Sequence, residues 1–168
     1  MDEVIIKEYS WEELISYCKR IYLDMENDGF IPEIIIAVSR GGYFTGLILS
    51  HLFKMQELFS VNTSTNKSDE IRSQRRHPQI QELFCGVNKK RLSGKKVLIV
   101  DDVINTGITL FTVQEYMQSL HINMEVKTAC MIYDTYQENN NHSLSYKADY
   151  YADERCAWAV FPWETIEI

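Results

Sequence analysis

The sequence predicts an α/β protein with a central, mainly parallel β-sheet and helices on both faces. Continuous apolar runs at Ile34–Val38 and Val97–Val100, with a further strand at Glu125–Tyr133, carry this prediction, because such runs suit strands that are buried on both faces. Segments with helical periodicity alternate with these strands, and this alternation is typical of parallel strands joined by right-handed crossovers. The 168 residues contain no repeat and no linker, so we expect one domain over residues 1–168.

The individual elements can be placed in order along the chain. Ser10–Glu13 has the pattern of a capping box, and the apolar residues behind it fall on one helical face. Gly29 and Pro32 end that first helix. Further helices are expected over residues 43–54 and 107–120, and further strands over 58–62, 83–87, 96–101, 149–152 and 157–161.

A long polar segment interrupts the predicted sheet at residues 62–80. It is too long for an ordinary connection, and loops of this kind are lids or disordered segments. We therefore expect a flexible loop here, within a core that spans about 30–134. Its basic side chains are candidates to contact a ligand: Lys67, Arg72, Arg75 and Arg76.

Charge and composition exclude several classes of function. The net charge of −7 disfavours broad adhesion to nucleic acid or to an anionic membrane. No apolar run has the length of a membrane span, and the N-terminus lacks the pattern of a signal peptide. The cysteines are far apart and form no Cys-x-x-Cys pair, which is typical of free thiols: Cys18, Cys85, Cys130 and Cys156. A cytoplasmic protein is expected.

The most informative segment follows the apolar run Val97–Val100. Two carboxylates, Asp101 and Asp102, come directly after that run, and Thr106–Thr109 then leads into a helical pattern. Paired carboxylates can accept hydrogen bonds from ribose hydroxyls, directly or through Mg²⁺, which prefers oxygen ligands. A Thr-Gly-x-Thr turn at a helix N-terminus offers backbone N–H groups to a phosphate. Each feature alone also fits a capped helix and a plain loop, but the uninterrupted combination favours a sugar-phosphate site.

This segment resembles the signature of the type I phosphoribosyltransferase family for 5-phosphoribosyl-1-pyrophosphate (PRPP). Within that family, the chain is most similar to short purine-salvage enzymes of the xanthine-guanine and hypoxanthine-guanine type. Ser39–Gly42 looks like their pyrophosphate loop, and Trp158–Glu164 resembles their base-binding hood. The resemblance implies the family's fold, with a small hood formed by the terminal segments, about 1–10 and 135–168.

The resemblance also implies an activity and its partners. The expected reaction transfers the phosphoribosyl group of PRPP to a purine base, giving a nucleoside monophosphate and pyrophosphate. Hypoxanthine and guanine are the expected bases, with xanthine as a further candidate and Mg²⁺ as the cofactor. Relatives form dimers or tetramers, so a homo-oligomer is expected.

Site residues are carried over from the family by position. The implied catalytic residues are Asp101, Asp102, Asn105 and Asp134. The 5′-phosphate is expected at Asn105, Thr106, Gly107, Ile108 and Thr109, and pyrophosphate at Ser39, Arg40, Gly41 and Gly42. The base is expected at Asp134, Trp158 and Ala159, and the metal at Asp102 and Glu164.

Two of these assignments, the turn at Arg40 and the base site at Trp158, also have chemical support of their own. Two glycines beside Arg40 let the backbone approach a ligand closely, while a guanidinium can bind pyrophosphate. Relatives carry a cis peptide before this basic residue, so one is expected here. The indole of Trp158 suits a flat heterocycle, although a Trp in a strand also fits a simple core position. Glu164 taken alone would be a solvated carboxylate.

Two positions depart from the 6-oxopurine enzymes. Asn105 replaces an Asp that is assigned there as the proton acceptor, and an amide cannot accept a proton at neutral pH. Asp134 replaces a Lys that donates to the 6-oxo group. Three hypotheses follow: Asp134 takes over proton acceptance and oxopurine activity survives, the pocket prefers an aminopurine, or the chain is a regulator that binds PRPP or a nucleotide. We favour retained catalysis, because both acids and the basic loop are present.

Overall fold

A six-stranded sheet forms the centre of the computed structural model, which describes residues 5–64, 79–83, 88–136 and 146–165. The strand order is β4-β3-β2-β5-β6-β7, and every neighbouring pair is parallel except β3 and β4. The strand bounds are β2 Ile34–Ser39, β3 Phe59–Ser64, β4 Gln79–Leu83, β5 Lys96–Ile104, β6 Glu125–Asp134 and β7 Tyr150–Arg155. The predicted mainly parallel sheet is therefore confirmed.

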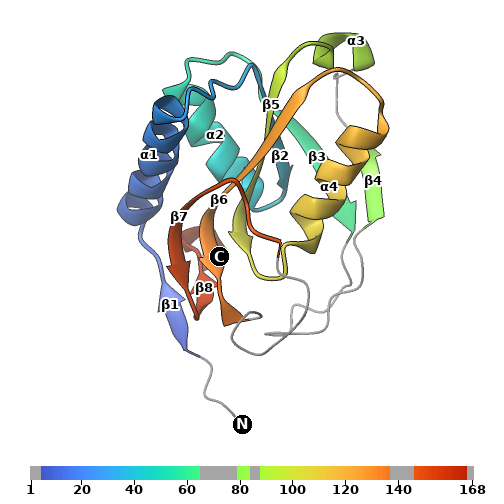
Figure 1. Cartoon of the computed structure of the whole chain (residues 1–168). Helices are drawn as coiled ribbons and strands as arrows, with labels where there is room; N and C mark the ends of the chain where they lie inside the picture. Colours follow the sequence, from blue (N-terminus) through green and yellow to red (C-terminus); the bar gives the residue numbers. More distant parts are fainter. Residues whose placement is uncertain (1–4, 65–78, 84–87, 137–145, 166–168) are drawn as a thin grey trace.

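Helices cover both faces of this sheet (Figure 1). The helix bounds are α1 Trp11–Asn27, α2 Gly42–Leu52, α3 Lys89–Leu92 and α4 Ile108–Ser119. On β5, Leu98 and Val100 belong to the core cluster that includes residues of α1 and α2. Val97 and Ile99 belong to a second cluster with residues of α4. All four side chains are fully buried, which explains why this strand reads as an unbroken apolar run.

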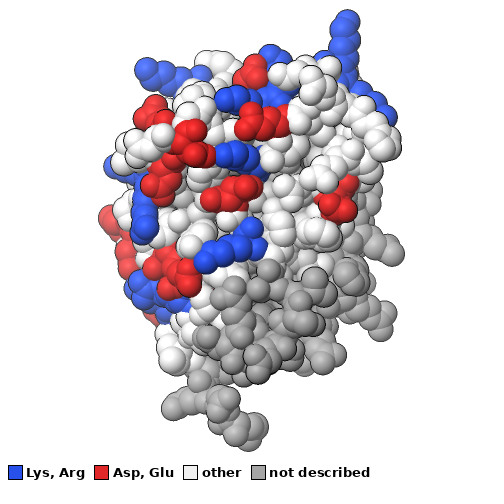
Figure 2. Space-filling model, viewed as in Figure 1, with Lys and Arg blue, Asp and Glu red and all other residues white. Residues whose placement is uncertain are grey.

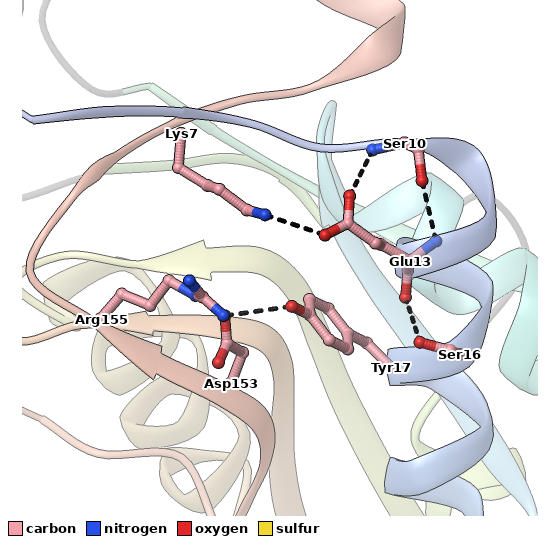
Figure 3. A network of polar contacts seen from close by, with 7 residues as sticks. All are labelled: Lys7, Ser10, Glu13, Ser16, Tyr17, Asp153 and Arg155. Carbon is pink, nitrogen blue, oxygen red and sulfur yellow. Dashed lines mark hydrogen bonds and ion pairs between the residues drawn. The ribbon is translucent and has the colours of Figure 1, made fainter.

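The capping box predicted at the start of α1 is present. The Glu13 N–H donates to Ser10 Oγ at 3.2 Å, and the Ser10 N–H donates to Glu13 Oε2 at 2.9 Å. The other carboxylate oxygen of Glu13 pairs with Lys7 Nζ at 2.9 Å (Figure 3). One turn further along, Tyr17 donates to Asp153 of β7 at 3.1 Å. These contacts join the start of α1 to the residues before it and to the edge of the sheet.

The expected hood forms from segments at opposite ends of the chain. Strand β1 (Ile6–Glu8) pairs in parallel with β8 (Trp158–Val160), and a short 3₁₀ turn, Pro162–Glu164, follows. This pair lies beside β6 and β7 in Figure 1. Stacked rings of Phe161 and Trp163, 4.5 Å apart, continue into Phe44 of α2, 5.1 Å from Trp163. Aromatic packing therefore holds the hood against the helices.

One strand differs from its predicted position. The sequence predicts a strand at 83–87, whereas β4 spans Gln79–Leu83 and residues 84–87 lie outside the described part. The sequence of β4 is largely polar, and its first residues were therefore assigned to the expected loop. Because β4 is an antiparallel edge strand, it does not need the apolar run of a central strand. The expected loop residues Lys67, Arg72, Arg75 and Arg76 lie outside the described residues.

Charged side chains do not separate into large regions of one sign on the face shown in Figure 2. Acidic and basic residues are interspersed there over the described part of the chain. Across the described residues, none of the helices combines the length and apolar character needed to cross a membrane.

Candidate active site

The carboxyl ends of the parallel strands meet at one edge of the sheet, and a cavity of about 220 Å³ opens there. In open α/β sheets this edge is where ligands bind. The hood supplies the opposite wall. The cavity is lined by Val38, Ser39, Thr63, Asp101, Asp102, Val103, Asn105, Thr109, Asp134, Trp158, Ala159, Phe161 and Glu164.

The two acids lie within β5, which continues to Ile104 rather than ending at residue 101. The Asp102 N–H donates to Asp101 Oδ1 at 3.0 Å, and the Val103 N–H donates to Asp102 Oδ1 at 2.7 Å. Burial, with a smaller contribution from the charge of Glu164, raises the pKa of Asp102 to about 6, although the hydrogen bond from the Val103 N–H opposes this shift. The ionised pair of Asp102 and Glu164 would therefore be stabilised by a positive charge.

The glycines after β2 let α2 start against these acids. A Cβ atom on Gly41 would overlap the carboxylate of Asp102, and one on Gly42 would overlap the carbonyl oxygen of Val100. A side chain at Gly41 would displace the Asp102 carboxylate, and one at Gly42 would displace the backbone of β5. The preceding Ser39–Arg40 peptide bond is cis, as the resemblance implies. This turn therefore lies directly beside the paired acids.

A second, smaller cavity of about 30 Å³ adjoins the first, at the turn between β5 and α4. Its lining includes Asn105, Thr106, Gly107 and Thr109. Gly107 has φ +72° at the N-cap of α4, and a Cβ atom there would overlap the backbone of Tyr146. The first turn of a helix has backbone N–H groups without intrahelical partners, which makes this turn a suitable anion site.

The two positions that depart from the oxopurine pattern contact each other. Asn105 Nδ2 donates to Asp134 Oδ2 at 2.7 Å. The other oxygen of Asp134 accepts from the backbone N–H of Tyr136 at 2.9 Å, and Asp134 is only 3% exposed. Neither substitution predicts this contact when it is read alone. The register of the sheet explains the contact. β5 and β6 are adjacent parallel strands, and Ile104 pairs with Tyr133, so the residues that follow, Asn105 and Asp134, lie side by side.

The hood contributes an aromatic and an acidic side chain to the cavity. Trp158 and Ala159 come from β8 and line the cavity. The backbone N–H of Trp158 donates to the backbone carbonyl of Ile5 at 2.8 Å. Glu164 Oε2 accepts from the backbone N–H of Phe161 at 2.9 Å. The hood thus fixes both ends of a wall whose surface is flat and aromatic near Trp158 and anionic at Glu164.

The donor set fits Mg²⁺ better than a metal that is held by protein ligands alone. No group of three or more His, Cys, Asp or Glu side chains that could hold a metal occurs among the described residues. Mg²⁺ is commonly held by one or two carboxylates together with substrate phosphates and water. Asp102 and Glu164 line the same cavity, and the charge of Glu164 raises the pKa of Asp102. These two carboxylates suit such a site.

The structure brings most of the predicted site residues together, but not all of them. Nine line the larger cavity: Ser39, Asp101, Asp102, Asn105, Thr109, Asp134, Trp158, Ala159 and Glu164. Thr106 and Gly107 line only the smaller one, whereas Arg40, Gly41, Gly42 and Ile108 line neither. Four residues that line the larger cavity were not predicted as site residues: Val38, Thr63, Val103 and Phe161. Val38 and Val103 could have been found, because each adjoins a predicted site residue.

Fold and site together define a class of protein. A parallel sheet, paired acids in the central strand β5 and a helix N-terminus beside them would suit a phosphorylated sugar at the sheet's edge. The chain belongs to the phosphoribosyl transferase domain family, whose model matches residues 9–166.

Solved structures with this fold include several purine enzymes. A purine phosphoribosyltransferase from Pyrococcus horikoshii is 28% identical, with a TM-score of 0.73 over 96% of this chain and 95% of that one. A xanthine-guanine-hypoxanthine phosphoribosyltransferase from Helicobacter pylori is 22% identical, with a TM-score of 0.76 over 97% and 95%. A Neisseria gonorrhoeae protein with bound ppGpp is 19% identical, with a TM-score of 0.76 over 100% and 94%. No curated protein matches the sequence.

Proposed function

We propose that this protein is a purine phosphoribosyltransferase of nucleotide salvage. It transfers the phosphoribosyl group of PRPP to hypoxanthine or guanine, with xanthine as a further acceptor, and forms the nucleoside monophosphate and pyrophosphate. The single observation that carries this proposal is the continuity of the site. One cavity joins Asp101 and Asp102 to Trp158, and the smaller cavity at Asn105, Thr106, Gly107 and Thr109 adjoins it.

Each part of PRPP has a matching part of the site. The N-terminal turn of α4 binds the 5′-phosphate, since a small cavity adjoins this turn and the first N–H groups of a helix lack intrahelical partners. Asp101 and Asp102 accept hydrogen bonds from the ribose hydroxyls. The pyrophosphate lies at Ser39–Gly42, where the glycines bring the turn against Asp102 and Arg40 supplies positive charge. Trp158 stacks on the base.

The reaction needs a leaving group, a cation-like ribose and a nucleophile. The bond from ribose C1 to the pyrophosphate oxygen breaks, C1 gains oxocarbenium character, and the base nitrogen attacks C1. The ionised carboxylates near the ribose stabilise the positive charge that develops on the ring. Mg²⁺, held by Asp102 and Glu164, would neutralise the pyrophosphate when it is bound. The hood limits the access of water, which would otherwise hydrolyse PRPP.

A second acceptor is favoured by one specific observation. Asp134 is a buried carboxylate on the base side of the cavity, and a carboxylate accepts hydrogen bonds rather than donating them. An exocyclic amine would therefore suit this position, and an adenine-type enzyme is the alternative. A regulator that binds PRPP or a nucleotide without chemistry is disfavoured, because both acids line the cavity.

The discriminating experiment is a panel of bases. The protein is mixed with PRPP, Mg²⁺ and one of hypoxanthine, guanine, xanthine, adenine or orotate, and the release of pyrophosphate is measured. We expect turnover with hypoxanthine or guanine, and its dependence on Mg²⁺ is tested with EDTA. Turnover of adenine alone would replace the proposal with the aminopurine alternative. Binding of PRPP without turnover of any base would leave only the regulator.

Two expectations accompany the proposed activity. The enzyme acts in the cytoplasm, where PRPP and free bases are present. It also acts as a homo-oligomer, dimer or tetramer, which size-exclusion chromatography with light scattering measures directly.

A further inference from the structure

The contact between Asn105 and Asp134 bears on how the purine base loses a proton in the proposed reaction. A neutral purine carries a proton on its imidazole ring, and that proton must leave when a ring nitrogen bonds to ribose C1. A side chain near the base that accepts this proton would speed the reaction. Asn105 lines both cavities, but its amide cannot accept one at neutral pH.

Four carboxylates line the larger cavity, and three are committed elsewhere. Asp101 and Asp102 lie at the end of β5 beside the Gly41 turn, where the ribose and pyrophosphate are placed. Glu164 acts electrostatically on Asp102. Asp134, on the neighbouring strand, is the carboxylate that remains for the base among the described residues of this cavity.

The hydrogen bonds around Asp134 hold it as an oriented carboxylate. Asn105 Nδ2 donates to one oxygen at 2.7 Å and the Tyr136 N–H donates to the other at 2.9 Å. Both donors favour the ionised form, which a buried carboxylate needs. Asp134 also lines the cavity beside Trp158, and a carboxylate oxygen can accept an N–H from a base. The same contact fixes the amide of Asn105, since only its NH₂ group can donate to Asp134.

We propose that Asp134 is the proton acceptor of the reaction and that Asn105 is its positioning residue. This inference rests on the proposed purine phosphoribosyltransferase activity. N9 of the base forms the bond to ribose C1, while the bond from C1 to pyrophosphate breaks and its electron pair leaves on oxygen. The proton on N7 moves to an oxygen of Asp134, which later releases it to water. Asn105 keeps that oxygen in place and keeps the carboxylate ionised.

The first test replaces the acceptor and retains its shape. Asp134→Asn is expected to lower kcat by about 10²–10⁴-fold, while the affinity for PRPP, measured by isothermal titration calorimetry, stays within about threefold. The acid limb of the pH profile of kcat disappears. A matched control is Asp149→Asn. The Asp149 carboxylate also accepts a backbone N–H, from Thr128 at 2.7 Å, but Asp149 lies just before β7 and does not line the cavity.

The second test separates positioning from direct chemistry. Asn105→Ala removes a donor that favours the ionised carboxylate, so the acid limb of kcat moves to higher pH. We expect kcat at pH 7 to fall about tenfold, with partial recovery at higher pH. A role in packing alone would lower activity equally at every pH. Small carboxylates such as formate should restore part of the activity of Asp134→Ala.

The outcomes distinguish this inference from the proposed function. If the wild-type protein turns over no base, the proposed function itself fails. If the wild type is active but Asp134→Asn keeps its kcat and its acid limb, only the proton-acceptor assignment is overturned. A variant that changes only the KM for the base, with kcat intact, likewise overturns it and leaves Asp134 as a base-binding residue.

Discussion

The two sides of the cavity are built in different ways. The side proposed for PRPP comes mainly from one continuous segment, in which the end of β5 runs through Asn105–Thr109 into α4. The base side comes from Asp134 on β6 and from Trp158 and Glu164 in the hood, and the hood needs β1 to pair with β8. A continuous segment fixes the spacing of its own groups, whereas the base side depends on contacts between distant parts of the chain.

This difference explains how far the sequence alone could predict the site. Asp101, Asp102 and the Thr-Gly-x-Thr turn are a local pattern, so their grouping was predicted and lies around the two adjoining cavities. The hydrogen bond between Asn105 and Asp134 was not predicted, because it depends on the register of β5 and β6. Arg40 was predicted from its neighbours but lines neither cavity.

The fold shows the same division between local and long-range information. The apolar strands β2, β5 and β6 were predicted because burial on both faces leaves a direct pattern in the sequence. The polar edge strand β4 was misplaced by several residues. Its position depends on pairing with β3, including a register shift between Asn62 and Thr63, and no local pattern encodes that pairing.

The largest expected effect tests the PRPP side. Gly41→Ala would force the Asp102 carboxylate out of place, and misplacement of a catalytic group by about 1 Å can cost about 10²-fold in rate. We expect kcat/KM for PRPP to fall about 10²–10³-fold in steady-state assays. The control is Gly29→Ala, where φ is +72° but no atom lies within 4 Å of the new Cβ. That change should cost stability and leave kcat/KM nearly unchanged.

The next effect tests the base side alone. Trp158→Ala removes a stacking surface, and stacking of a base on an aromatic ring is worth about 1–3 kcal/mol. We expect the KM for the base to rise about 5- to 150-fold, while the dissociation constant of PRPP changes little. Trp158→Phe should recover much of the loss. An equal weakening of PRPP binding would contradict the division of the cavity into two sides.

A smaller effect tests how much the buried charge of Asp102, on the PRPP side, lowers the stability of the fold. Burial raises the pKa of Asp102 from 3.8 to about 6, so the folded state binds this proton more tightly than the unfolded state does. The ionised carboxylate therefore destabilises the fold above about pH 6, and this cost fades as the pH falls toward 4. Asp102→Asn should stabilise the ligand-free protein at pH 8 by about 1–2 kcal/mol.

Thermal unfolding in EDTA measures this effect. The melting temperature of Asp102→Asn should exceed that of the wild type by about 2–6 °C at pH 8, and the gain should be smaller at pH 4. Catalysis should be lost at both values. Equal stabilisation at pH 4 and pH 8 would show that the cost does not come from ionisation of Asp102.

The smallest effect concerns the support of the hood. Ser10→Ala removes the cap of α1, next to the Lys7–Glu13 pair that links β1 to the helix. Loss of such a cap costs about 1 kcal/mol, which corresponds to about 2–4 °C in melting temperature. Ser16→Ala, an exposed change one turn later, serves as the control. If the hood depends on this junction, the KM for the base rises modestly and the KM for PRPP does not.

The pairing of β1 with β8 also constrains when the protein becomes functional during synthesis. Ile6 is made more than 150 residues before its partner Trp158, so the partner of β1 does not exist while the sheet around β2 and β5 can already assemble. Contacts of such high sequence separation form late because a long loop must close first. A ribosome-bound chain could therefore hold the PRPP side of the cavity before it has any surface on which a base could stack.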